Sequence, residues 1–90
     1  MRIVRLEWDD YRIEHIALHD VEPHEAWEVC QDPLHLAHHE GRNRYRLYGQ
    51  TDDGRYWFVV LEQVAGSRYK PITARDMTTD EKRNYRRLQR

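Results

Sequence analysis

The chain has 90 residues, which is enough for one domain with one hydrophobic core and too few for a second. Hydrophobic residues make up 39% of the chain, which argues against wholesale disorder, and the longest apolar run, residues 56–61, is too short to span a membrane. The net charge of -1 conceals an asymmetry, because residues 1–41 carry three basic and ten acidic side chains whereas residues 66–90 carry eight and three. One surface could therefore attract a polyanion that another would repel, unless the two ends pair in space.

The first third of the chain predicts a strand and two helices. Residues 3–8 are β-branched and apolar with partial alternation, which is typical of a strand. Asp9 offers a capping carboxylate, and apolar residues recur at helical spacing over residues 13–21. A second helix should begin near Pro23, whose fixed φ suits a first turn, and end at Asp32, which precedes a proline.

Beyond this point the apolar period changes from about 3.6 residues to 2, which predicts strands. Residues 34–36 and 44–48 alternate between apolar and polar side chains. The Asp-Gly pair at residues 53–54 favours a tight hairpin turn, because these residues tolerate positive φ angles. Residues 56–61 are apolar on both faces and should form a central strand covered on both sides, and residues 69–74 should form the next strand, at or near an edge.

A last helix should begin at about Thr79, because Thr78 and Glu81 form the Thr-x-x-Glu capping box. Its apolar side would present Tyr85 and Leu88 inward, and its outer face is basic. The predicted order is β-α-α-β-β-β-β-α, an α+β fold with a single antiparallel sheet of four to five strands, two N-terminal helices and one C-terminal helix. Helices at both chain ends can cover the apolar face of the sheet.

Arginines from separate parts of the chain form the first candidate site. Arg46 shares one strand face with Tyr48, Arg55 follows the Asp-Gly turn, and Arg75 stands where the last strand meets the last helix. If Arg46, Arg55 and Arg75 meet in one concavity, their guanidinium groups could stabilise the phosphate charge that develops when a 2′-hydroxyl attacks its own phosphodiester. A nearby Tyr, His or Glu would transfer protons. The alternative is a set of solvated or salt-bridged surface arginines.

Histidines form a second candidate site. His15 and His19 are four residues apart on the first predicted helix, and three more histidines lie at positions 35, 38 and 39, so the spacing permits a Zn²⁺ site. Neither a His-Glu-x-x-His motif nor paired cysteines accompany them. His19 could equally cap its helix. The basic outer face of the last helix could track phosphates or simply be solvated.

The opening residues lack the long apolar stretch of a secretory signal, and the single cysteine, Cys30, cannot form an internal disulfide. Both observations favour the cytoplasm. Cys30 is best explained as a small apolar residue on a helix face.

Taken together, short segments along nearly the whole chain resemble the BrnT family, ribonuclease toxins of bacterial type II toxin–antitoxin systems with a compact RelE-like fold. The most specific segment is Ile72-Thr73-Ala74-Arg75 before the capped helix. The other matching segments are Glu7-Trp8-Asp9, Ile13-Glu14-His15-Ile16, His19-Asp20-Val21, Glu25-Ala26, Tyr48-Gly49-Gln50-Thr51, Asp53-Gly54-Arg55, Val59-Val60-Leu61 and Asp76-Met77-Thr78 with Glu81 and Tyr85.

The resemblance implies a toxin that degrades RNA, is neutralised by a cognate antitoxin and contacts DNA only within the toxin–antitoxin complex. The residues that match the family's pattern, or its basic strand positions, are His19, Arg46, Arg55, Arg75, Glu81 and Tyr85. The chain departs from the family where many members have Lys-His-Gly-Val, because it has Leu18-His19-Asp20-Val21.

Three hypotheses follow. The first is a toxin that acts as a metal-independent endoribonuclease without a cofactor, in which the three arginines hold the scissile phosphate while His19, Glu81 or Tyr85 moves protons. The second, motivated by Leu18 in place of the family's lysine, is a non-catalytic RelE-like module that docks an antitoxin-like partner or nucleic acid. The third is a metal-dependent enzyme that uses the histidines.

Overall fold

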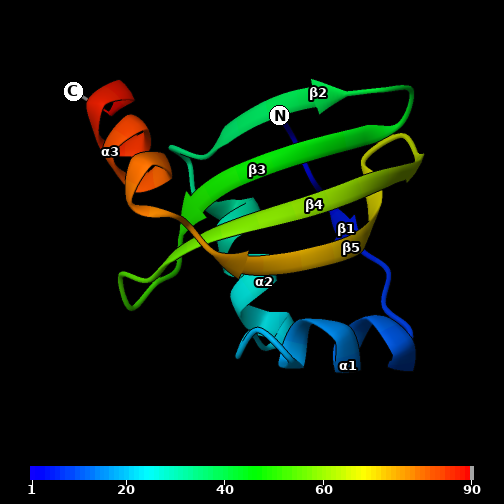
Figure 1. Ribbon diagram of the computed structural model, residues 1–90. Helices are drawn as coiled ribbons and strands as arrows, with labels where there is room; N and C mark the ends of the chain where they lie inside the picture. Colours follow the sequence, from blue (N-terminus) through cyan, green and yellow to red (C-terminus); the bar gives the residue numbers. More distant parts are fainter. Residues whose placement is uncertain (90) are drawn as a thin grey trace.

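The computed structural model describes residues 1–89 and contains the eight elements in the predicted order (Figure 1). They are β1 (Arg5–Leu6), α1 (Asp10–Ala17), α2 (Pro23–Gln31), β2 (Leu36–Glu40), β3 (Arg44–Gln50), β4 (Tyr56–Ala65), β5 (Arg68–Asp76) and α3 (Thr79–Leu88). The five strands form one sheet in the order β1-β5-β4-β3-β2, so β4 is the central strand, as predicted.

The helices begin where the sequence signals predict. The Asp9 side chain accepts a hydrogen bond from the Arg12 amide at the start of α1, and Pro23 occupies the first turn of α2. At α3 the capping box is complete, because Thr78 Oγ1 accepts from the Glu81 amide while Glu81 Oε1 accepts from the Thr78 amide. Local side-chain chemistry thus fixes all three helix starts.

The sheet is mixed, so the prediction of a wholly antiparallel sheet is wrong at one edge. Strands β2 to β5 are antiparallel, as their short connections require, but β1 runs parallel to β5, with Arg5 beside Arg68 and Leu6 beside Tyr69. The chain reaches β2 only after α1 and α2 have carried it from one edge of the sheet to the other. The second predicted strand also begins later than expected, at Leu36, because Asp32 Oδ1 first accepts from the Leu34 amide in a turn.

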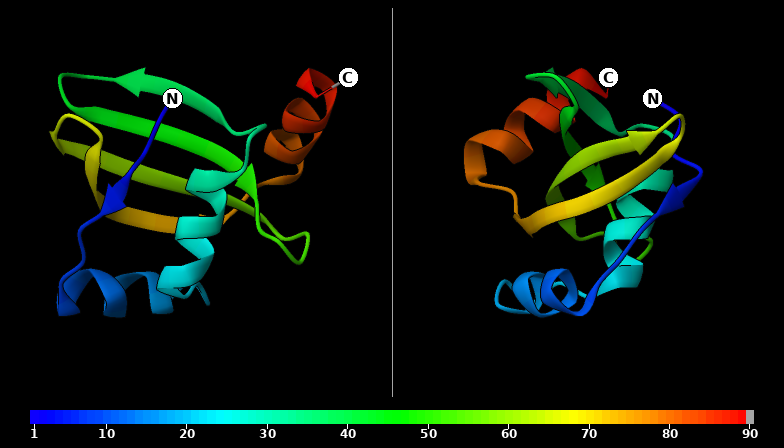
Figure 2. Two further views of the ribbon diagram at one scale, coloured as in Figure 1. Left: turned by 180° about the vertical axis from the view of Figure 1, so that it is seen from behind. Right: turned by 90° about the vertical axis from the view of Figure 1, so that its right-hand side faces the viewer.

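Side chains alternate between the two faces of the sheet. The odd-numbered residues of β3 and β4 face α1 and α2 and form the core with residues of those helices. The fully buried large side chains are Trp57, Ile16, Leu47, Leu61, Val21, Val29, Val59 and Pro71. This is the covered face of the sheet, and Figure 2 shows α2 packed across it.

The even-numbered residues of β3 and β4 form the other face, which we call the open face because only α3 packs on it, at one end (Figure 2). The prediction that helices from both chain ends cover one apolar face is therefore wrong. The expectation that β4 is covered on both sides is also wrong, because on the open face Phe58 is buried but Val60 is only half-buried. Tyr85 points inward as predicted, whereas Leu88 is 55% exposed because the last turn of α3 projects beyond the sheet (Figure 1).

Candidate functional site

A cavity of about 230 Å³ lies between the open face and α3. We call it the open-face cavity. Its walls come from β2, β3 and the first two turns of α3, and its lining residues are Leu36, His38, Arg46, Tyr48, Asp80, Glu81, Asn84 and Tyr85. The cavity therefore combines a histidine, an arginine, two tyrosines and two carboxylates from parts of the chain that are distant in sequence.

The strand register explains how these side chains meet. His38 pairs with Arg46 across β2 and β3, and Leu36 pairs with Tyr48. The two β3 side chains that line the cavity therefore each have a β2 neighbour on the open face. The row that contains Tyr48 continues through Phe58 to Arg75 on β5. Arg75 lies over the Phe58 ring, with its guanidinium carbon 4.2 Å from the ring centroid.

Arg75 and Glu81 form a bidentate pair at the junction of β5 and α3. Arg75 Nη1 lies 2.8 Å from Glu81 Oε1, and Nη2 lies 3.2 Å from Oε2. The hydrogen bond from Arg75 is the main reason that the pKa of Glu81 is lowered, so Glu81 is ionised at neutral pH. Because Glu81 also caps α3 through the Thr78 amide, it ties the guanidinium group to the helix start.

Tyr48 lies near both arginines, two residues from Arg46 along β3 and separated from Arg75 by Phe58 in its cross-strand row. Its ring packs against Phe58 at 5.1 Å between centroids and meets the edge of the His38 ring at 5.9 Å. Burial raises the pKa of the Tyr48 phenol, an effect that the positive charge of Arg46 partly opposes. The phenol is therefore a neutral hydrogen-bond donor at physiological pH. Arg46 itself pairs with Glu40, Nε to Oε2, at 2.8 Å.

Of the six residues predicted from the sequence, Arg46 and Glu81 line this cavity, and Arg75 pairs with Glu81. Tyr85 also lines it, but its hydroxyl donates to Asp32 Oδ2 at 2.6 Å. Burial and this hydrogen bond raise the pKa of Tyr85. The side chain thus joins α3 to the end of α2.

The expectation that Arg46, Arg55 and Arg75 converge is wrong for Arg55. Its guanidinium group lies on the covered-face side of the sheet, where Nη1 is 2.9 Å from Glu25 Oε2 and the guanidinium carbon is 4.5 Å from the Trp57 ring centroid. Glu25 is only 6% exposed and also accepts from Trp57 Nε1, so Arg55 neutralises a buried carboxylate at the start of α2.

His19 lies after the last turn of α1, which covers the opposite face from the cavity. Its ring is exposed and lies 5.9 Å from that of His15. At the next position many family members have glycine, whereas this chain has Asp20. Asp20 adopts a φ of 62°, the left-handed conformation that glycine adopts without strain.

The sequence prediction missed His38 as a member of this site and grouped it with the other histidines instead. His38 and His39 point to opposite faces of β2, because adjacent strand residues alternate, and His39 stacks on Tyr45 at 4.7 Å on the other side. Within residues 1–89, no three His, Cys, Asp or Glu side chains gather as potential metal ligands. The pairing of His38 with Arg46 was the signal that could have identified it.

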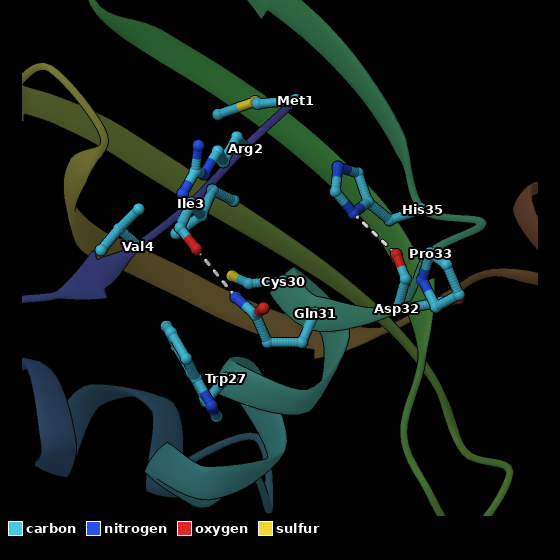
Figure 3. A pocket seen from close by; sticks show the side chains of 10 residues that line it. All are labelled: Met1, Arg2, Ile3, Val4, Trp27, Cys30, Gln31, Asp32, Pro33 and His35. Atoms are coloured by element: carbon cyan, nitrogen blue, oxygen red, sulfur yellow. Dashed lines mark hydrogen bonds between the residues drawn. The ribbon is translucent and has the colours of Figure 1, made fainter.

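A larger cavity, of about 460 Å³, lies on the other side of the molecule between the N-terminal segment and α2 (Figure 3). Two of its polar side chains already have partners: Gln31 Nε2 donates to the Ile3 carbonyl at 2.9 Å, and His35 Nδ1 lies 2.9 Å from the Asp32 carbonyl oxygen. Arg2 is the one arginine or lysine among its lining residues. It offers no arrangement of cations comparable with that of the open-face cavity.

Comparison with known families identifies the family of the chain. The family model described as "Ribonuclease toxin, BrnT, of type II toxin-antitoxin system" matches residues 8–81, which include every lining residue of the open-face cavity except Asn84 and Tyr85. The comparison with curated proteins found no match. No helix within residues 1–89 is long and apolar enough to cross a bilayer. The chain belongs to the BrnT family of ribonuclease toxins of type II toxin–antitoxin systems, which implies RNA as its substrate and an antitoxin as its partner.

Proposed function

We propose that the chain is a metal-independent endoribonuclease and that the open-face cavity is its active site. The observation that carries the proposal is that Arg46 and Arg75 lie near the neutral Tyr48 phenol on one face of the sheet, with His38 on the same face. RNA contains its own nucleophile, the 2′-hydroxyl, so fixed cations and one proton acceptor are sufficient for cleavage.

In this proposal the phosphodiester lies over Tyr48, between the two guanidinium groups. Arg46 contacts Glu40 through Nε and lines the cavity, and in this proposal its terminal nitrogens contact a phosphoryl oxygen. Arg75 is held by Glu81, which acts as a positioning residue because it orients the guanidinium group without contacting the substrate. The Tyr48 hydroxyl donates a hydrogen bond to a phosphoryl oxygen.

His38 is the proton acceptor in this proposal. Its imidazole takes the proton of the 2′-hydroxyl as that oxygen attacks phosphorus, and the bond from phosphorus to the 5′ oxygen breaks. The departing oxygen takes a proton from solvent, and the products are a 2′,3′-cyclic phosphate and a 5′-hydroxyl. His19 and Arg55 have no part in this step because they lie on the other side of the sheet, and Tyr85 supports α3.

A pair of histidine variants tests the proposal. Purified protein incubated with single-stranded RNA in EDTA should release 2′,3′-cyclic phosphate ends, and His38→Ala should lower the rate by about 10²–10⁴-fold, the usual contribution of a general base. His19→Ala is the matched control and should cleave like the unmodified protein. Absence of cleavage by the folded protein, or loss of cleavage through His19→Ala with His38→Ala unaffected, would contradict the proposal.

One observation favours a second function, a non-catalytic module that docks its antitoxin and reaches DNA only through that complex. Both Arg46 and Arg75 already face carboxylates, Glu40 and Glu81, so their charge is partly neutralised. RNA that stays intact after prolonged incubation, together with a stable complex with the antitoxin, would support this function over the nuclease.

A further inference from the structure

The outer face of α3 carries a stripe of cations that the proposed active site does not use. We call it the α3 stripe and define it as Lys82, Arg83, Arg86 and Arg87. With Thr79 these residues line a groove of about 400 Å³. Their spacing of three and four residues places them on one side of the helix, away from Glu81 and Asn84, which line the open-face cavity.

Most of this charge lacks a carboxylate partner. Arg83 pairs with Asp80 at 3.1 Å, but no carboxylate of residues 1–89 lies within 4.0 Å of Lys82, Arg86 or Arg87. Arg87 instead donates to the Asn84 side chain. Arg46 and Arg75, in contrast, are each paired with a carboxylate. The stripe is therefore a surface on which the positive charge of the C-terminal part of the chain remains available to an anionic partner.

An aromatic ring adjoins the cations. Tyr56, at the start of β4, has the Arg86 guanidinium carbon 5.0 Å and the Lys82 ammonium nitrogen 5.9 Å from its ring centroid, and its hydroxyl accepts from Arg86 Nε at 3.3 Å. The Tyr85 ring also packs on the Tyr56 ring in an edge contact, with 5.9 Å between centroids. Cations beside an aromatic ring are what proteins use to hold single-stranded nucleic acid, by phosphate contact and by base stacking.

We infer that the α3 stripe binds the backbone of single-stranded RNA where the strand runs past the open-face cavity. The inference rests on the proposed function, because that cavity gives the strand its path. A strand that leaves the cavity needs only to cross α3, whose diameter is about 10 Å, to reach the stripe. Most acidic side chains of residues 1–41 lie in or beside α1 and α2, on the opposite side of the sheet, and would repel a strand that ran toward that side (Figure 2). An acidic protein segment could use the cations alone, whereas the adjoining Tyr56 ring favours RNA.

The test measures binding without cleavage. The probe is a 2′-O-methylated single-stranded RNA, which lacks the attacking hydroxyl, and its affinity is measured by fluorescence anisotropy over a range of salt concentrations. Each phosphate contact to a single strand contributes about 0.7 to the slope of log K against log salt, so Arg86→Gln with Arg87→Gln should reduce the slope by about 1.4 and weaken binding more than tenfold near 0.1 M salt. Both side chains are exposed, so circular dichroism should show an unchanged fold.

The matched control removes the same charge elsewhere. Arg5→Gln with Arg42→Gln changes two arginines that lie away from α3 and have no carboxylate of residues 1–89 within 4.0 Å, and it should leave the slope and the affinity unchanged. Equal losses in the two double variants would overturn the inference. So would a stripe variant that binds RNA normally but loses the antitoxin, because the stripe would then dock protein. If RNA binds through the stripe but the unmodified protein never cleaves it, the inference holds and the proposed nuclease function fails.

Discussion

Removal of the Tyr85 hydroxyl tests whether this side chain has a structural role or a catalytic one. Tyr85 is 3% exposed and donates to Asp32 Oδ2, which also accepts from the Gln50 amide at 2.9 Å, so Asp32 joins the end of α2, the end of β3 and α3. A hydrogen bond to a charged acceptor stabilises a protein by about 1.5–3 kcal/mol. Because Asp32 keeps its backbone donors, we expect Tyr85→Phe to lower the free energy of unfolding by about 1.5 kcal/mol, or the melting temperature by roughly 10 °C for a domain of this size.

The assay compares melting temperature and RNA cleavage in the same preparations, well below the melting temperature of the variant. If Tyr85 only anchors α3, Tyr85→Phe cleaves RNA at the normal rate despite its lower stability. Tyr48→Phe is the matched control: its hydroxyl has no hydrogen-bond partner within residues 1–89, so we expect normal stability and slower cleavage. A Tyr85→Phe protein as stable as the unmodified one but inactive would refute this reasoning and assign Tyr85 to proton transfer.

Three further predictions concern stability, measured by urea denaturation. The pKa of Glu81 lies below its ordinary value of 4.5, so the stability that its carboxylate contributes is complete above that pH and is lost as the pH falls through the folded-state pKa. The free energy of unfolding of Glu81→Gln should therefore fall less steeply at acid pH than that of the unmodified protein. Identical acid sensitivity in both proteins would argue against the Arg75 pair. Gly49→Ala should lower the free energy of unfolding by about 1–3 kcal/mol, because the added Cβ would lie 2.9 Å from Val29 Cγ1 and 3.1 Å from the Val29 carbonyl oxygen. An unchanged midpoint of urea denaturation would show that α2 can move to accommodate the methyl group without loss of stability. Since Asp20 has a positive φ, Asp20→Gly should be more stable than Asp20→Ala by about 1 kcal/mol, and the reverse order would contradict the described backbone.

The sequence predicted the elements of this fold well because their signals are local. The Thr78–Glu81 capping box and Pro23 each specify a helix start within one turn of chain, and the apolar run over residues 56–61 identifies the central strand. The parallel pairing of β1 had no such signal. Arg5 and Leu6 form a strand of two residues whose partner lies more than sixty residues further along the chain.

The site was predicted only in part because a face of a sheet depends on register. Arg46 and Arg75 lie in adjacent rows of the open face through cross-strand pairing, while their shared role in catalysis stays a prediction. Arg55 precedes β4 and lies on the same side of the sheet as Trp57, two residues later. Its buried partner Glu25 belongs to α2, and no rule of sequence spacing connects that helix to Arg55. His38 was grouped with the wrong neighbours, because its pairing with Arg46 follows from the length of the turn between β2 and β3.

The position of bound RNA tests the central claim most directly. We expect a titration of isotope-labelled protein with the 2′-O-methylated RNA to shift the amide signals of His38, Arg46 and Tyr48, together with those of the first turns of α3. The signals of His19 and of the residues around the larger cavity should stay in place. Shifts that gather on α1 or beside Gln31, with the open face unperturbed, would contradict the assignment of the open-face cavity as the RNA site.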